Sequence, residues 1–153
     1  TDGALVIGCP IEALADARNP RHLTALAPVL AARVDEVKLY SIWLHLDRLA
    51  IPNRLGWTVD NTVAALDELE REHGTSRVTL ATRRRARVLL SEWLSRTSPQ
   101  RRPVGAEDIL DGTIRSSRSV KAAKGSRSSI SRRWGIVSSL GVDDFVAALR
   151  EAA

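Results

Sequence analysis

Arginine is the residue whose number and spacing in this sequence most clearly indicate a chemistry. Twenty of the 23 basic residues are arginine, and residues 77–135 hold 15 basic side chains against 4 acidic ones, a net charge of +11. A planar guanidinium donates two parallel hydrogen bonds to a phosphate, and several together release counterions from a polyanion. The segment is therefore predicted to bind nucleic acid; a solvated basic face, or one that docks an acidic protein, would have the same composition.

The charge is unevenly distributed along the chain. Residues 1–76 carry a net charge of −4 and residues 77–153 one of +9, against +5 for all 153 residues. This polarity predicts that one side of the folded molecule faces a polyanion, and duplex DNA is the favoured partner. The predicted phosphate contacts are Arg83, Arg84, Arg85, Arg87, Arg101, Arg102, Arg115, Arg118, Lys121, Lys124, Arg127, Arg132 and Arg133.

Spacing distinguishes two parts of this basic half. From Arg115 to Arg127 a basic residue recurs at every third position, which keeps much of the charge on one side of a helix, although Gly125 interrupts it. We expect this run to contact nucleic acid, and a disordered basic tail is the alternative. Arg101 and Arg102 lie between two prolines. This segment is predicted to be either an extended arm that lies along a nucleic-acid groove or a solvated linker.

Residues typical of catalysis or metal binding are few and widely separated. His22, His45 and His73 have no neighbouring ligand pattern, and Cys9 is the only cysteine. One cysteine makes neither an intrachain disulfide nor a cysteine–zinc site, and no glycine-rich phosphate loop is present. We therefore expect no enzyme activity, no metal and no cofactor.

A mainly helical fold has to position these residues. Apolar residues make up 44% of the chain and charged residues 27%, a balance typical of globular domains. Apolar spacing predicts a central buried helix over 29–49, an amphipathic helix over 58–73 that Gly74 ends, and a last helix capped near Asp143. In that last helix Phe145, Val146 and Leu149 are expected to face inward.

The segment between residues 76 and 95 is open to two interpretations. Residues 76–80 alternate polar and apolar side chains, which predicts a half-buried strand. Residues 82–95 then form either a hairpin or a helix capped by Thr82, with Ala86, Leu89, Leu90 and Trp93 inward. We favour the helix because no glycine or asparagine is available for a tight turn.

The most specific pattern lies in residues 40–80. A helix ends near 49, a short helix covers 51–55, the turn Leu55-Gly56-Trp57-Thr58 leads into the helix to 73, and a strand follows from 77. Gly56 permits the turn, Trp57 fills the angle between crossing helices, and Thr58 caps the second helix. With Ala65, Leu66 and Leu69 downstream, the segment resembles the winged helix–turn–helix DNA-binding superfamily. The resemblance implies that Thr58 and Asn61 approach base edges, and a regulatory or chromosome- or plasmid-associated role follows by analogy.

The helix over 58–73 departs from that superfamily in its charge. It carries five acidic side chains and one basic one, so DNA phosphates would repel it from a groove: Asp60, Asp67, Glu68, Glu70 and Glu72 against Arg71. We therefore expect binding mainly through the DNA backbone. The alternative is an adaptor whose acidic helix binds a protein while the basic region binds RNA or an acidic partner.

The predicted organisation is a helical domain with a winged-helix-like core over 1–97, a linker over 98–105 and a basic helical region over 106–153. A minor β element accompanies the core, and the basic region starts with a helix from 106 to about 114. The uncharged stretch 3–11 is too short to cross a bilayer. We expect a cytoplasmic protein, associated with the nucleoid if it binds DNA.

Overall fold

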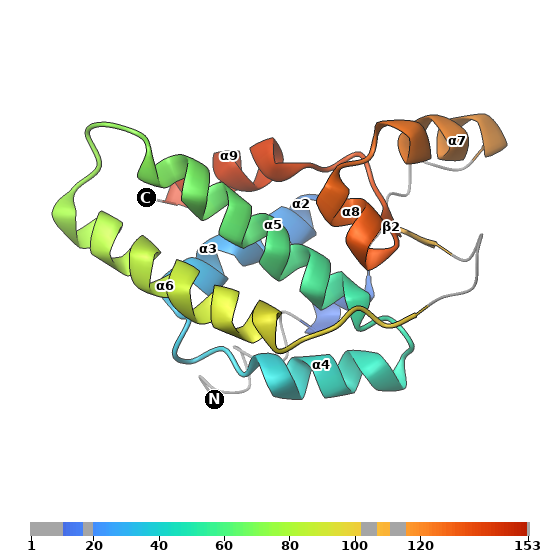
Figure 1. Ribbon diagram of the computed structural model, residues 1–153, viewed down its shortest axis with the longest axis horizontal. Coiled ribbons are helices and arrows are strands. Elements are labelled where there is room, and N and C mark those ends of the chain that lie inside the picture. The colour runs from blue at the N-terminus through green and yellow to red at the C-terminus, as the bar shows by residue number, and fades with distance from the viewer. Residues whose placement is uncertain (1–10, 17–19, 102–106, 111–115, 153) are drawn as a thin grey trace.

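The computed structural model describes residues 11–16, 20–101, 107–110 and 116–152, and these residues are mainly helical (Figure 1). The mainly α class is confirmed. After a helical segment at 11–15 the elements are α2 (Pro20–Thr24), α3 (Leu26–Ala32), α4 (Leu39–Arg48), α5 (Asn53–Glu70), α6 (Arg77–Ser95), β1 (Asp108–Ile109), α7 (Ser117–Ser126), α8 (Ser129–Trp134), β2 (Ile136–Val137) and α9 (Val142–Ala152).

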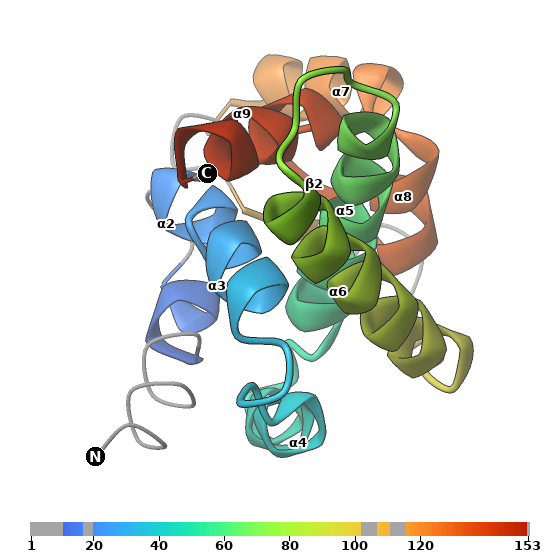
Figure 2. The same cartoon turned by 90° about the vertical axis from the view of Figure 1, so that its left-hand side faces the viewer.

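Helix α5 is the centre of the fold. It packs against α3, α6, α8 and α9, as Figures 1 and 2 show from two sides. Its buried polar side chains donate to carbonyls of the preceding turn: Thr58 to Arg54 at 2.8 Å, Asn61 to Trp57 at 2.9 Å and Thr62 to Thr58 at 2.7 Å. Because these donors are satisfied within the helix, α5 tolerates burial on nearly all sides.

The predicted central helix over 29–49 is wrong. The chain forms two helices there, α3 and α4, and the N–H of Glu36 donates to the carbonyl of Arg33 (2.9 Å) in a turn between them. Helix α4 lies at the surface, where Tyr40 is 71% exposed. The broad apolar stripe therefore belongs to two amphipathic helices, and α5 takes the central place.

The predicted short helix over 51–55 and the turn at 55–58 are also wrong, because α5 runs without interruption from Asn53 to Glu70. Gly56 lies inside the helix, and its missing side chain admits the ring of Trp134 from α8; an added Cβ would overlap three ring atoms. Thr58 bonds within the helix instead of capping it. A winged-helix-like core is not confirmed.

The strand predicted over 76–80 is replaced by the start of α6. Ser76 caps this helix by accepting a hydrogen bond from the N–H of Thr79 (3.2 Å), and Val78 is 79% exposed. The buried positions Ala86, Leu90 and Leu94 follow a spacing of four. The helical period over 19 residues outweighs the alternation of the first five, so the helix alternative for 82–95 is confirmed with an earlier start.

The minor β element lies elsewhere in the chain. Strands β1 and β2 pair in parallel, with Asp108 opposite Ile136 and Ile109 opposite Val137. The N–H of Asp108 donates to the Gly135 carbonyl at 2.9 Å. The helix predicted from 106 to about 114 is therefore wrong at 108–109, because the backbone of these residues pairs with β2, a strand distant in the sequence.

A single apolar core draws on helices from both ends of the sequence. Phe145, Val146 and Leu149 of α9 are buried in it as predicted, and the Phe145 ring meets Trp57 edge-on with centroids 5.5 Å apart. The buried Trp134 of α8 meets Trp43 in the same way at 6.3 Å. Across the part of the chain that the structure describes, no helix is both long and apolar enough to span a membrane.

Candidate nucleic-acid interface

The arginines of α6 face the protein's own carboxylates. Arg84 donates to Glu70 at 2.6 Å, Arg85 forms a bidentate pair with Asp35, and Arg87 lies 3.1 Å from Asp67. Arg87 also lies 3.4 Å from Glu70. The acidic helix of the first half and the basic helix of the second pack side by side, so much of the charge asymmetry along the sequence is cancelled in space.

This pairing changes which cations can reach a phosphate. Three of the four arginines at 83–87 have carboxylate partners, and Arg83 lines a cavity between α3, α6 and α9. The same pairs occupy Asp67 and Glu70 of the acidic helix, and Glu72 pairs with Arg150. Arg84, Arg85 and Arg87 are therefore engaged by carboxylates of the protein, whereas Arg83 of α6 and Glu68 of α5 have no ion-pair partner among the described residues.

The two residues predicted to approach base edges are inside the protein. Thr58 and Asn61 are each 0% exposed, and both donate to carbonyls of their own helix. Direct base contact by either side chain is therefore wrong. The reason is that α5 is enclosed by other helices instead of lying at the surface.

The remaining candidates gather on α7, α8 and the segment before β1. Helix α7 is fixed by a capping box in which the Ser116 side chain accepts from the N–H of Ser119 (3.1 Å) and Ser119 bonds back. None of its residues is buried, and its basic side chains Arg118 and Lys121 are exposed to solvent. We name as the α7–α8 basic surface the residues Arg101, Arg118, Lys121, Lys124, Arg127, Arg132 and Arg133. Arg102 and Arg115, also predicted contacts, lie outside the described residues.

Four of these arginines line one cavity of about 340 Å³, to which Asn53, Gln100, Glu107 and Trp134 also contribute. The four are Arg101, Arg127, Arg132 and Arg133. Glu107 is the one carboxylate among the described lining residues, and Lys124 lies 2.9 Å from it. The cavity is therefore strongly positive.

Asn53, at the start of α5, holds two walls of this cavity in place. Its side-chain amide donates to the carbonyls of Gln100 and Trp134, both at 3.0 Å, and its oxygen accepts from the N–H of Gln100 at 2.6 Å. These bonds fix the backbone beside Arg101 and the end of α8 beside Arg133. Sequence patterns missed Asn53 and Gln100; a polar residue just after Pro52 was the available signal.

Arg127 has unused hydrogen-bonding capacity. Its Nε and Nη1 are buried and have no hydrogen-bond partner among the described residues. Buried donors without partners cost free energy, and an anion in the cavity would supply acceptors. Hydrogen bonds from Lys124 and from its own backbone, with the charges of Lys124 and Arg127 as smaller causes, hold the pKa of Glu107 below its ordinary value. The lowered pKa favours the ionised form of Glu107 beside these two cations.

Arg132 and Arg133 differ in how firmly they are held. The Arg133 guanidinium lies 5.4 Å from the centroid of the Trp134 ring and 3.9 Å from Asp60. Arg132 is exposed and has no carboxylate partner among the described residues. Arg133 is therefore held in place and Arg132 is free to adjust. Such a pair can contact phosphates whose positions vary along a nucleic-acid strand.

The α5–α6 ion pairs should make stability depend on acid pH. Arg84, through its hydrogen bond, and Arg87, through its charge, hold the pKa of Glu70 below its ordinary value of 4.5. A carboxylate with a lowered folded-state pKa stabilises the fold above its unfolded pKa, and loses this contribution as pH falls through the folded value. We expect Glu70→Gln to lower the melting temperature at pH 7. The difference from wild type should shrink as pH falls below about 4.5 and vanish once the pH is below the lowered folded-state pKa.

The matched control for this measurement is Glu68→Gln. Glu68 lies on the same helix, is exposed and pairs with no cation among the described residues. Its replacement should leave the melting temperature nearly unchanged at every pH. Equal pH profiles for the two variants would contradict the assignment of the effect to the pairs with Arg84 and Arg87.

Comparison of the chain with protein-family models, with curated proteins and with solved structures finds no match.

Proposed function

We propose that this protein binds duplex DNA by its phosphate backbone, through the α7–α8 basic surface. The observation that carries the proposal is a cavity lined by four arginines, where Arg127 keeps two buried donors without a partner among the described residues. Arginine recognises phosphate oxygens with paired hydrogen bonds, and a phosphate group would satisfy these donors. Lys124 neutralises Glu107, so no uncompensated carboxylate among the described residues of the cavity repels the ligand.

The mode of binding follows from which residues are exposed. Thr58 and Asn61 are buried, so the proposal includes no recognition helix that reads bases in a groove. Arg118 and Lys121 on α7 extend the positive surface beyond the cavity, at the spacing of one helical turn. Backbone contacts of this kind give affinity without sequence preference, and the affinity falls steeply with added salt.

The salt dependence can be stated as a number. Five of the cations have no carboxylate partner among the described residues, namely Arg101, Arg118, Lys121, Arg127 and Arg132. If each neutralises one phosphate, the slope of log K against log salt is about −4.5, or about a 500-fold loss of affinity from 50 to 200 mM salt. Fluorescence anisotropy with a labelled 20-base-pair duplex measures this slope.

Two double variants of equal charge separate a local surface from a general effect of net charge. Arg127→Gln/Arg132→Gln and Arg84→Gln/Arg85→Gln each lower the formal net charge from +5 to +3. We expect the first to reduce the slope to about −2.7 and the loss over that salt range to about 40-fold. The second should leave the slope unchanged, because Arg84 and Arg85 pair within the protein.

Three outcomes would reject the proposal. The first is absence of duplex binding at 50 mM salt, and the second is equal flattening by both double variants. The third is a clear preference for structured RNA over duplex DNA, which would place the phosphates on another nucleic acid. No observation favours the adaptor function, because the carboxylates Asp67, Glu70 and Glu72 of the acidic helix pair with arginines of this chain.

A further inference from the structure

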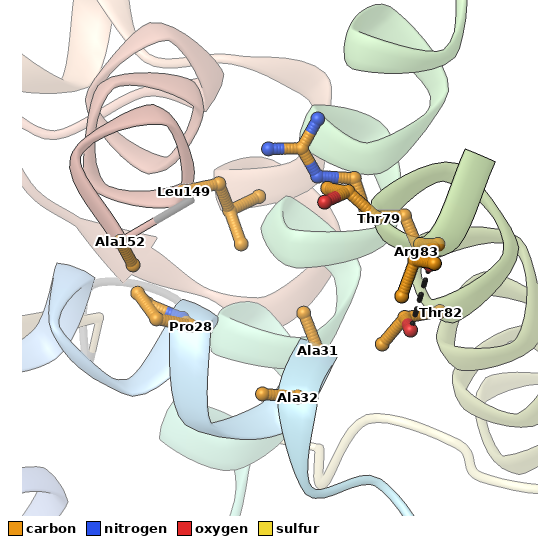
Figure 3. A pocket seen from close by; sticks show the side chains of 9 residues that line it. Pro28, Ala31, Ala32, Thr79, Thr82, Arg83, Leu149 and Ala152 are labelled. Atoms are coloured by element: carbon orange, nitrogen blue, oxygen red, sulfur yellow. Dashed lines mark hydrogen bonds between the residues drawn. The ribbon is translucent and has the colours of Figure 1, made fainter. Parts of the chain in front are cut away.

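A second cavity lies between α3, α6 and α9, away from the proposed DNA surface (Figure 3). Its volume is about 250 Å³, the space of about eight water molecules. Most of its wall is apolar and made of small side chains: Pro28, Ala31 and Ala32 from α3, with Leu149 and Ala152 from α9. Small residues on two facing helices leave a space that an apolar chain can fill.

The third wall of this cavity, made by α6, contains Val78 and the polar side chains of the cavity, with Thr82 among them. Helix α6 contributes Thr79 and Arg83, which are one turn apart and therefore on the same side of the helix. In Figure 3 the Arg83 side chain extends from α6 toward α9. Thr79 accepts a hydrogen bond from the Ser76 hydroxyl (2.9 Å), which leaves its own proton for a further acceptor.

The charge of this wall has no counterpart among the described residues. Arg84, Arg85 and Arg87 pair with carboxylates, whereas Arg83 pairs with none in the described part of the chain, and no Asp or Glu lines the cavity. An anionic group at this wall would supply the missing partner of the Arg83 guanidinium.

We propose that this cavity is a binding site for a small aliphatic carboxylate of about six to eight carbon atoms, consistent with a cavity of about eight water volumes. The carboxylate accepts hydrogen bonds from Arg83 and Thr79, and the alkyl chain lies against Ala31, Ala32 and Leu149. One guanidinium and one hydroxyl suit a singly charged carboxylate. Contact between the alkyl chain of the ligand and the apolar wall contributes the rest of the affinity.

Three probe ligands test this pairing of charge and chain. Hexanoate carries both features, acetate only the carboxylate and hexanol only the chain. Titration of each into the ¹⁵N-labelled protein, followed by the amide shifts of Ala31, Thr79 and Leu149, gives the dissociation constants. We expect hexanoate to bind in the high-micromolar to millimolar range and about tenfold tighter than either partial probe.

Variants then assign the two halves of the site. Arg83→Gln should weaken hexanoate about tenfold and leave hexanol unchanged, because only the charged hydrogen bonds are lost. Ala32→Leu, at an exposed wall position, should weaken both by filling the cavity. Arg96→Gln is the control, since Arg96 is an exposed arginine at the end of α6 outside the cavity.

The results that would overturn the site are equally definite. Hexanoate that binds no tighter than acetate would mean that Arg83 attracts any anion and that the cavity plays no part. Equal affinity of wild type and Arg83→Gln, or no shift at 10 mM hexanoate, would reject the site. None of these results depends on DNA binding, because the titrations contain no nucleic acid.

Discussion

Replacing Arg54 by methionine is expected to lower the free energy of unfolding by about 3 kcal/mol, the lower end of the range for breaking a buried ion pair. Arg54 donates to both oxygens of Asp108, at 2.6 and 2.9 Å, and the two side chains are only 13% and 9% exposed. The variant leaves the Asp108 carboxylate buried without its cation. The same guanidinium also donates to the carbonyls of Leu14 (2.8 Å) and Ala15 (3.1 Å), so the change releases residues 11–15 and β1 from α5 together.

Thermal unfolding followed by circular dichroism measures this loss. For a chain of this size, about 3 kcal/mol corresponds to a fall in melting temperature of roughly 6–12 °C. Arg48→Met is the control, because Arg48 is exposed on α4 and has no carboxylate partner among the described residues. It should shift the melting temperature little.

A double variant tests the pairing itself. In Arg54→Met/Asp108→Leu the buried charge is removed together with its partner, and an apolar pair of similar volume takes its place. We therefore expect the double variant to be more stable than Arg54→Met alone. A double variant that is less stable than the single one would contradict the view that an unpaired Asp108 causes the loss.

Gly56→Ala is expected to destabilise the fold, although alanine is the better helix former. Alanine in a helix interior gains about 1 kcal/mol over glycine. The added Cβ at position 56, however, would overlap ring atoms of Trp134, whose side chain is fully buried and cannot move outward freely. Overpacking of this kind costs about 3 kcal/mol, so we expect a net loss of about 2 kcal/mol and a melting temperature lower by roughly 4–8 °C.

Gly125→Ala is the matched control for this prediction. Gly125 lies in α7, and a Cβ added there meets no atom within 4 Å. The same substitution should therefore raise stability by up to about 1 kcal/mol. Effects of equal sign at the two positions would show that the contact between Gly56 and Trp134 does not decide the outcome. Near-ultraviolet circular dichroism of the tryptophans should change for Gly56→Ala and stay the same for Gly125→Ala.

The clash also links the core to the proposed DNA surface. Trp134 lines the four-arginine cavity, and its indole N–H donates to Asp60 on α5 at 2.9 Å. Arg133 stacks on the same ring. If Gly56→Ala displaces this ring, the guanidiniums beside it lose their fixed position, and affinity for duplex DNA should fall together with stability.

Local sequence signals predicted the helices well where the period was long. The mainly α class and the burial of Phe145, Val146 and Leu149 in the last helix are confirmed, and so is the helix over 82–95. These features depend on apolar spacing and on short-range hydrogen bonds, which neighbouring residues determine. Short alternations were less reliable: residues 76–80 became helical because the longer pattern of α6 includes them.

The sequence by itself determined how many charges this protein carries and which helices hold them. Only the tertiary structure decided which of those charges remain open. Once α6 packs against α5 and α3, Arg84 and Arg87 meet carboxylates of α5 and Arg85 meets Asp35 in the turn after α3, 14 to 50 residues away in the chain. In contrast, Nε and Nη1 of Arg127 have no hydrogen-bond partner among the described residues. Gly56 likewise admits a ring from a residue that is distant in sequence. Composition and spacing show which charged residues are present. Which of them form pairs over long sequence distances depends on how the helices pack, and local sequence patterns do not predict this packing.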